Sequence, residues 1–77
     1  MNLWNITKTQ KYLLSSIDDQ LDLQKLRLQE IGFKIGEPVE FIQESLFGGP
    51  RTYLVANSII ALEKDVAEKI KVELANQ

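Results

Sequence analysis

The sequence predicts a small, mainly β domain in which about five short strands curl into a barrel beside one helix. The chain has 77 residues, and a domain of this length buries about 60% of the surface of its unfolded chain, enough for one small core. Apolar residues recur in short alternating runs, and glycine and proline stand at isolated turn positions. An open sheet would expose two edges, so a barrel is favoured. We expect a single domain over residues 1–77.

The first strand is predicted at residues 11–17, where the sequence reads KYLLSSI. Three apolar residues near the N-terminus are expected to pack before it: Leu3, Trp4 and Ile6. A polar stretch at residues 18–20 then ends the strand.

A helix is predicted at residues 22–31 because apolar residues recur there near helical spacing. Asp22 is the expected N-cap, and its carboxylate also suits the positive end of the helix dipole. The predicted inward face consists of Leu23, Leu26 and Ile31, with Leu28 on the flank. Gly32 should end the helix in the left-handed conformation, with Phe33 folding back onto it as in a Schellman motif.

The second half of the chain reads as strands joined by turns. Gly36, Glu37 and Pro38 form a turn before a strand at residues 39–45, whose inner face carries Val39 and Phe41. A looser turn at Gly48-Gly49-Pro50 leads into strands at 51–56 and 59–62, paired as a hairpin across Asn57-Ser58.

The chain is expected to end with a helical turn and a closing strand. Residues 63–69 form the turn, with Val66 and Ala67 facing inward, and residues 70–74 form the strand because apolar and charged side chains alternate there. Residues 75–77 should fray.

Composition excludes several classes of function. The chain has no histidine and no cysteine, so it lacks the residues of a Ser-His triad, of a disulfide and of an imidazole or thiolate metal site. We expect no enzyme activity. The chain has nine scattered basic residues and eleven acidic ones, which gives a net charge of −2. This charge balance disfavours nucleic-acid binding. The sequence shows neither a membrane-spanning run nor a secretory signal, so we expect a cytoplasmic protein.

Two short segments carry the candidate sites. Large apolar residues at Leu46 and Phe47 lie on a glycine-bounded loop, where they either dock a partner or fold over one end of the barrel as a plug. The candidate partner-binding residues are Leu46, Phe47, Gly48, Gly49, Pro50 and Arg51. Weak candidates for iron(II) or another divalent cation are Glu63, Asp65 and Glu68, although acids in the first turn of a helix are expected from its dipole alone.

Five pieces of the sequence, in order, resemble the FeoA family, the small ferrous iron transport protein A. The first is the helix-to-strand segment Arg27-Leu28-x-Glu30-Ile31-Gly32-Phe33-x-x-Gly36-Glu37-x-Val39. The loop Leu46-Phe47-Gly48-Gly49-Pro50 resembles the Pro-Leu-Gly-Asp/Gly-Pro loop of the family. The remaining pieces are Ile60-Ala61-Leu62, Val66-Ala67 and Ile70-Lys71-Val72. The resemblance covers residues 6–73, nearly the whole chain.

The resemblance implies an SH3-like β-barrel and a cytoplasmic, non-enzymatic interaction module. Such a module assists or regulates FeoB, the membrane transporter for ferrous iron, by contact with its cytosolic part. The alternative is a regulatory or divalent-metal-sensing domain, like the C-terminal SH3-like domain of iron-dependent repressors. A third possibility is a homo-oligomer, because strand edges pair across twofold axes.

Three residues depart from the family pattern. Leu46 stands where the loop often begins with proline, Asn57 where glycine is frequent, and Glu63 where arginine is frequent. Asparagine tolerates the left-handed region, so the turn at Asn57 should be kept. The acidic Glu63 reverses a surface charge that would steer a partner.

Overall fold

A computed structural model describes residues 1–75, and the expected fraying of Asn76 and Gln77 lies outside that range. The expected fraying of Ala75 is wrong, because its amide donates to the Lys11 carbonyl at 2.9 Å. Five antiparallel strands form one curled sheet in the order β4-β3-β2-β1-β5. The strands are β1 (Tyr12–Ile17), β2 (Pro38–Glu44), β3 (Arg51–Val55), β4 (Ser58–Leu62) and β5 (Ile70–Leu74). The helices are α1 (Leu23–Glu30) and α2 (Lys64–Ala67), with 3₁₀ turns η1 (Leu3–Asn5), η2 (Asp19–Leu21) and η3 (Leu46–Gly48). The mainly β class with one short helix is therefore confirmed.

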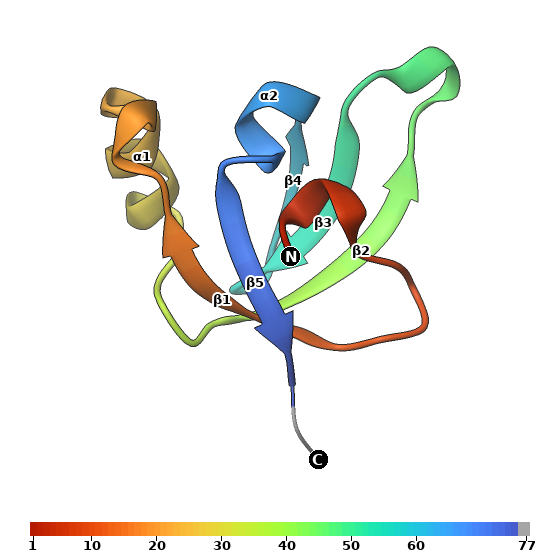
Figure 1. Cartoon of the computed structure of the whole chain (residues 1–77), viewed down its shortest axis with the longest axis horizontal. Helices are drawn as coiled ribbons and strands as arrows, with labels where there is room; N and C mark the ends of the chain where they lie inside the picture. The colour runs from red at the N-terminus through yellow and green to blue at the C-terminus, as the bar shows by residue number, and fades with distance from the viewer. Residues whose placement is uncertain (76–77) are drawn as a thin grey trace.

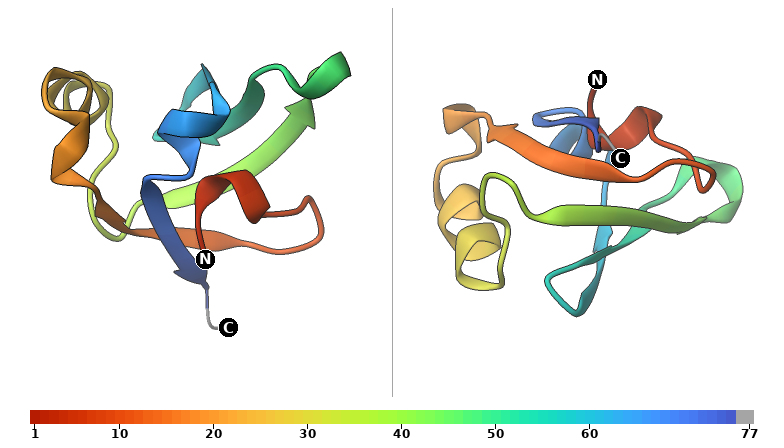
Figure 2. Two further views of the ribbon diagram at one scale, coloured as in Figure 1. Left: turned by 45° about the horizontal axis from the view of Figure 1, so that its top comes forward. Right: turned by 90° about the horizontal axis from the view of Figure 1, so that it is seen from below.

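The sheet curls without closing by hydrogen bonds. Within the described residues, β4 and β5 each pair on one side only in the named ladders, and no ladder joins them to each other. The short helix α2 connects these two strands instead, and its Ala67 is fully buried. Figure 1 shows the curled sheet with α1 at one side and the loop between β2 and β3 at the other, and both views in Figure 2 agree.

The core lies inside the curl and is completed by the N-terminal segment. Leu3 and Ile6 are buried, as the sequence predicts, and Trp4 packs partly buried against the core. The largest fully buried side chains are Tyr53 and Phe33. The predicted inner face of β2 is also confirmed, because Val39 is buried and Phe41 packs against the core.

The start of α1 differs from the prediction. Asp22 occupies the N-cap position with a φ of 50°, but its side chain makes no cap hydrogen bond. Its carbonyl oxygen instead accepts from the Lys25 amide at 3.0 Å. The preceding turn η2, at residues 19–21, brings the chain into the helix with Leu21 already buried.

The predicted inward face of α1 is wrong. Leu23 is 68% exposed, Leu26 and Ile31 are also exposed, and Leu28 is the buried residue of the helix. The physical reason is that Leu21 before the helix and Phe33 after it already supply contacts to the core. The short helix therefore needs only one inward side chain.

The end of α1 confirms the Schellman motif. Gly32 has a φ of 112°, the Phe33 amide donates to the Leu28 carbonyl at 2.9 Å, and the Gly32 amide donates to the Gln29 carbonyl at 3.2 Å. Phe33 is fully buried. An added Cβ on Gly32 would lie 2.5 Å from the Cβ of Ala56, so the end of α1 packs closely against the hairpin between β3 and β4.

That hairpin has a two-residue turn, as predicted, but the turn lies one residue earlier in the chain. Its turn consists of Ala56 and Asn57, with φ values of 50° and 67°, and β4 begins at Ser58 rather than at Ile59. Positive φ at both central residues is the mark of the type I′ turn, whose twist matches that of the flanking strands. Asn57 adopts the left-handed conformation, as expected.

Candidate functional site

The loop between β2 and β3 is closed at its neck by its own residues. The Ser45 hydroxyl donates to the Pro50 carbonyl, and the Gly49 amide donates to the Leu46 carbonyl at 3.4 Å. The second contact closes the single turn η3, and the first ties the two ends of the loop together. The loop is thus a compact, self-bonded projection between two strands.

The tip of this loop presents apolar side chains to solvent. Phe47 is 102% exposed and Leu46 is 83% exposed, so the interpretation of these residues as a plug over the barrel end is wrong. The ends of the curled sheet are filled by Leu3 and other buried side chains, which leaves no core position for the tip. Phe47 has a φ of 61° and Gly48 one of 71°. A left-handed phenylalanine is unfavourable, and such residues cluster at binding sites.

Arg51 anchors the base of the loop. Its guanidinium carbon lies 5.2 Å from the centre of the Trp4 ring and 4.4 Å from the centre of the Phe41 ring. One guanidinium nitrogen donates to the Trp4 carbonyl and the other contacts a Glu44 carboxylate oxygen at 3.3 Å. The Arg51 side chain is 17% exposed. Two aromatic faces and two acceptors therefore hold this cation in place.

Tyr53 joins the same N-terminal turn to β3 from inside the core. Its hydroxyl donates to the Leu3 carbonyl at 2.7 Å, and its ring lies 5.9 Å from that of Phe41, centre to centre. Burial raises the pKa of Tyr53 to about 12, and the nearby positive charge of Arg51 offsets only part of that rise. Sequence reasoning treated Tyr53 only as a strand residue. The available signal was its hydroxyl, which must find a partner on an inward strand position.

The structure does not bring the three candidate metal ligands together. No group of three or more acidic side chains able to hold a metal ion occurs among residues 1–75. Asp65 accepts a hydrogen bond from the Val66 amide at 3.0 Å, which is a local helix-start contact. Glu63 immediately precedes α2 and Glu68 immediately follows it. Glu63 makes no side-chain cap hydrogen bond, and the three acids are spread along a single helical turn.

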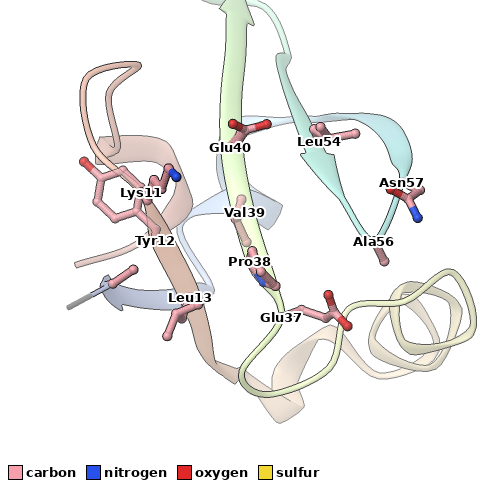
Figure 3. Close-up of a pocket in the computed structure, with 11 residues that line it drawn as sticks. Lys11, Tyr12, Leu13, Glu37, Pro38, Val39, Glu40, Leu54, Ala56 and Asn57 are labelled. Carbon is pink, nitrogen blue, oxygen red and sulfur yellow. The ribbon is translucent and has the colours of Figure 1, made fainter. Parts of the chain in front are cut away.

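A shallow hollow of about 440 Å³ lies along β1, β2 and the β3–β4 hairpin. Figure 3 shows its lining, with Glu37 just before β2, Glu40 on that strand and Asn57 projecting from the hairpin turn. Leu13, Pro38 and Leu54 supply apolar surface. Its charged residues are Lys11, Glu37 and Glu40.

Within residues 1–75, no helix has the length and apolar character that crossing a membrane requires.

Comparison with known proteins gives one family and a consistent set of folds. The model of the FeoA domain matches residues 1–74, whereas a search of curated proteins gives no match. The solution structure of iron(II) transport protein A from Clostridium thermocellum is 27% identical with a TM-score of 0.83. The match covers 96% of this chain and 45% of the C. thermocellum chain, so this chain spans less than half the length of that relative.

Two further structures extend the comparison. Stenotrophomonas maltophilia FeoA, an SH3 domain protein in complex with zinc, is 26% identical with a TM-score of 0.80, covering 95% of this chain and 89% of its own. The ScaR protein with bound Zn²⁺ is 25% identical with a TM-score of 0.76, covering 95% of this chain and 36% of its own. Because the FeoA model matches nearly the whole sequence and the solved FeoA proteins share its SH3-like fold, the chain belongs to the FeoA family, which is linked to ferrous iron transport.

Proposed function

We propose that this chain is a cytoplasmic interaction module that assists or regulates a FeoB ferrous iron transporter through its Leu46–Arg51 loop. Membership of the FeoA family supports the link to ferrous iron transport. The S. maltophilia relative has been put forward as an activating factor for that transport. The proposal needs no reaction at the domain itself, only contact with the cytosolic part of the transporter.

The observation that carries the proposal is the full exposure of Phe47 at the tip of a loop with a fixed base. Aromatic side chains that enter a partner's pocket dominate binding free energy at protein interfaces. Leu46 beside it enlarges the apolar surface, and Arg51 holds the strand from which the loop projects. A tip that is ordered before binding loses less conformational entropy on binding.

The test is an NMR titration of the labelled protein with the GTP-binding domain and the other cytosolic segments of a cognate FeoB. We expect amide shifts that cluster on residues 46–51. Phe47→Asp should weaken binding by about tenfold or more, because a hot-spot aromatic contributes about 2 kcal/mol or more. Aspartate tolerates the left-handed region better than phenylalanine, so the variant should stay folded.

Two control variants make the result specific. Phe47→Asn removes the aromatic ring without adding charge, so it separates lost contact from charge repulsion. Ile35→Asp puts the same charge on another exposed loop residue, which is 68% exposed, and should leave binding unchanged. Unchanged binding of Phe47→Asp, or equal loss in Ile35→Asp, would contradict docking through this loop.

A regulatory or metal-sensing role is the second candidate, and the likeness to ScaR with bound Zn²⁺ favours it. The zinc bound to S. maltophilia FeoA also supports a metal-sensing role. Anaerobic calorimetry with iron(II) and manganese(II) tests this role. Saturable heat that Glu63→Gln or Glu68→Gln abolishes would assign the site to α2, whereas heat that both variants retain would place binding elsewhere.

A further inference from the structure

The outer edge of β4 has backbone groups that no other strand satisfies. The two-residue turn at Ala56-Asn57 makes Val55 and Ser58 the closing pair of the β3–β4 ladder, so hydrogen-bonded pairs alternate from there. The N–H and C=O groups of Ile59 and Ala61 therefore point away from β3. Within the part of the chain that the structure describes, neither residue makes a backbone hydrogen bond on that side.

This edge also lacks the features that usually protect an edge strand. The sequence of β4 is Ser-Ile-Ile-Ala-Leu, without charge or proline, and its register with β3 has no bulge. The opposite edge of the sheet is different. There the N-terminus pairs with β5, because the Val72 amide donates to the Met1 carbonyl at 2.9 Å and Asn2 forms a bridge with Lys71.

A groove of about 340 Å³ lies between β4 and α1. Leu28 and Ile31 line it from α1, while Ala61 and Leu62 line it from β4. The end of α1 comes close to the hairpin beyond the groove, because an added Cβ on Gly32 would lie 2.5 Å from the Cβ of Ala56. The groove thus places an unsatisfied edge residue, Ala61, beside an apolar wall, which is the arrangement that binds extended peptides by strand addition.

Charged residues at the groove restrict its occupant. Arg27 and Glu63 both belong to the lining, and neither forms a salt bridge with any residue that the structure describes. A carboxylate in the occupant would pair with Arg27, and a basic side chain would pair with Glu63.

We propose that the groove between α1 and β4 binds an extended segment of a partner protein as a sixth strand. Backbone groups of Ile59 and Ala61 exchange hydrogen bonds with the segment. Alternate apolar side chains of the segment pack on Leu28 and Ile31, and one acidic side chain pairs with Arg27. This surface is separate from the Leu46–Arg51 loop, which lies at the other side of the molecule (Figure 1).

The probe is a blocked heptapeptide that alternates valine with threonine and carries one central aspartate, titrated into the isotopically labelled full chain. We expect saturable amide shifts at Ile59, Ala61, Leu28 and Ile31. Amide hydrogen exchange at Ile59 and Ala61 should slow by about tenfold at saturation, because bonded amides exchange only on opening. The same peptide with its pairing amides N-methylated should not bind.

Ala61→Pro is the decisive variant. Proline removes the N–H that points outward and leaves the ladder to β3 intact, as on natural edge strands. It should weaken peptide binding by about tenfold, the loss of one hydrogen bond of about 1.4 kcal/mol. Ala61→Val keeps the N–H and should bind like the parent chain. If the proline variant does not fold, Arg27→Gln replaces it and should weaken binding of the aspartate peptide alone.

Three outcomes would overturn the proposal. The first is that no amide signal shifts at millimolar peptide although the domain is folded. The second is that Ala61→Pro and Arg27→Gln both bind the peptide as tightly as the parent chain. The third is a shift at Ile59 and Ala61 that depends on protein concentration without peptide, which would assign the edge to a second copy. Phe47→Asp should leave peptide binding unaltered, so failure here and failure of transporter docking are distinguishable.

Discussion

Replacing Gly32 by alanine should destabilise the domain through two separable effects. The φ of 112° at Gly32 is a conformation that alanine rarely adopts, and a left-handed non-glycine residue costs about 1–2 kcal/mol. The new Cβ would also lie 2.5 Å from the Cβ of Ala56, and forced overpacking costs about 1–3 kcal/mol. The sum of about 2–5 kcal/mol is large against the stability of about 4–12 kcal/mol expected for a chain of this length.

The second effect can be removed on its own. In the Ala56→Gly background the clashing atom is gone, and the remaining Ala56 atom within reach is its Cα at 3.9 Å, an ordinary contact. The cost of Gly32→Ala should then fall to about 1–2 kcal/mol. Ala56→Gly alone should be close to neutral, because Ala56 itself has a φ of 50° that glycine adopts without strain.

Urea unfolding followed by the fluorescence of the single tryptophan, Trp4, measures all four chains of this cycle. A coupling free energy of about 1–3 kcal/mol between positions 32 and 56 is expected. An equal cost of Gly32→Ala in both backgrounds would refute the close approach of α1 to the hairpin. It would leave the backbone conformation as the sole reason for this glycine.

Three further predictions concern the core and the loop base. Because burial raises the pKa of Tyr53 from 10.0 to about 12, the contribution of Tyr53 to stability should be constant below pH 10 and fall by up to about 2.7 kcal/mol as the pH rises through 12. In urea unfolding, Tyr53→Phe should abolish this loss of stability at high pH. A loss that persists in Tyr53→Phe would contradict the assignment to Tyr53. Arg51→Lys should lower stability by about 1 kcal/mol, because lysine loses the stacking on the two aromatic rings. It should also broaden the NMR amide signals of the β2–β3 loop, and sharp, unshifted signals would show that this stacking does not hold the loop in place. Leu28→Ala should cost about 2–5 kcal/mol and Leu26→Ala below about 0.5 kcal/mol, so equal costs by thermal unfolding would oppose the observed helix face.

The parts of the fold that the sequence predicts correctly are those that depend on neighbouring residues. Gly32 and Phe33 carry a complete local signal for a helix end, and the observed hydrogen bonds match it. The strand Ile70–Leu74 has the predicted bounds because alternation of side chains needs no distant contact. Asn57 adopts a positive φ because its side chain tolerates that region whatever surrounds it.

The parts that sequence reasoning missed depend on residues far apart in the chain. The contact of Arg51 with the Trp4 carbonyl spans 47 positions, and the hydrogen bond from Tyr53 to Leu3 spans 50. Periodicity cannot show which aromatic ring a cation meets across such a separation. The helix face was wrong for the same reason, since burial of Leu28 depends on the core positions that Leu21 and Phe33 occupy.

The open sheet explains why the two proposed surfaces lie where they do. A sheet that does not close needs other groups to fill its interior, and the N-terminal segment does this with Leu3 while its Trp4 holds Arg51. The same segment also pairs with β5 and so satisfies that edge. The β4 edge then stays available, and the apolar tip at Phe47 stays outside a core that is already filled. Contacts with partners are therefore expected at the β4 edge and at the β2–β3 loop, and each can be removed without disturbing the other.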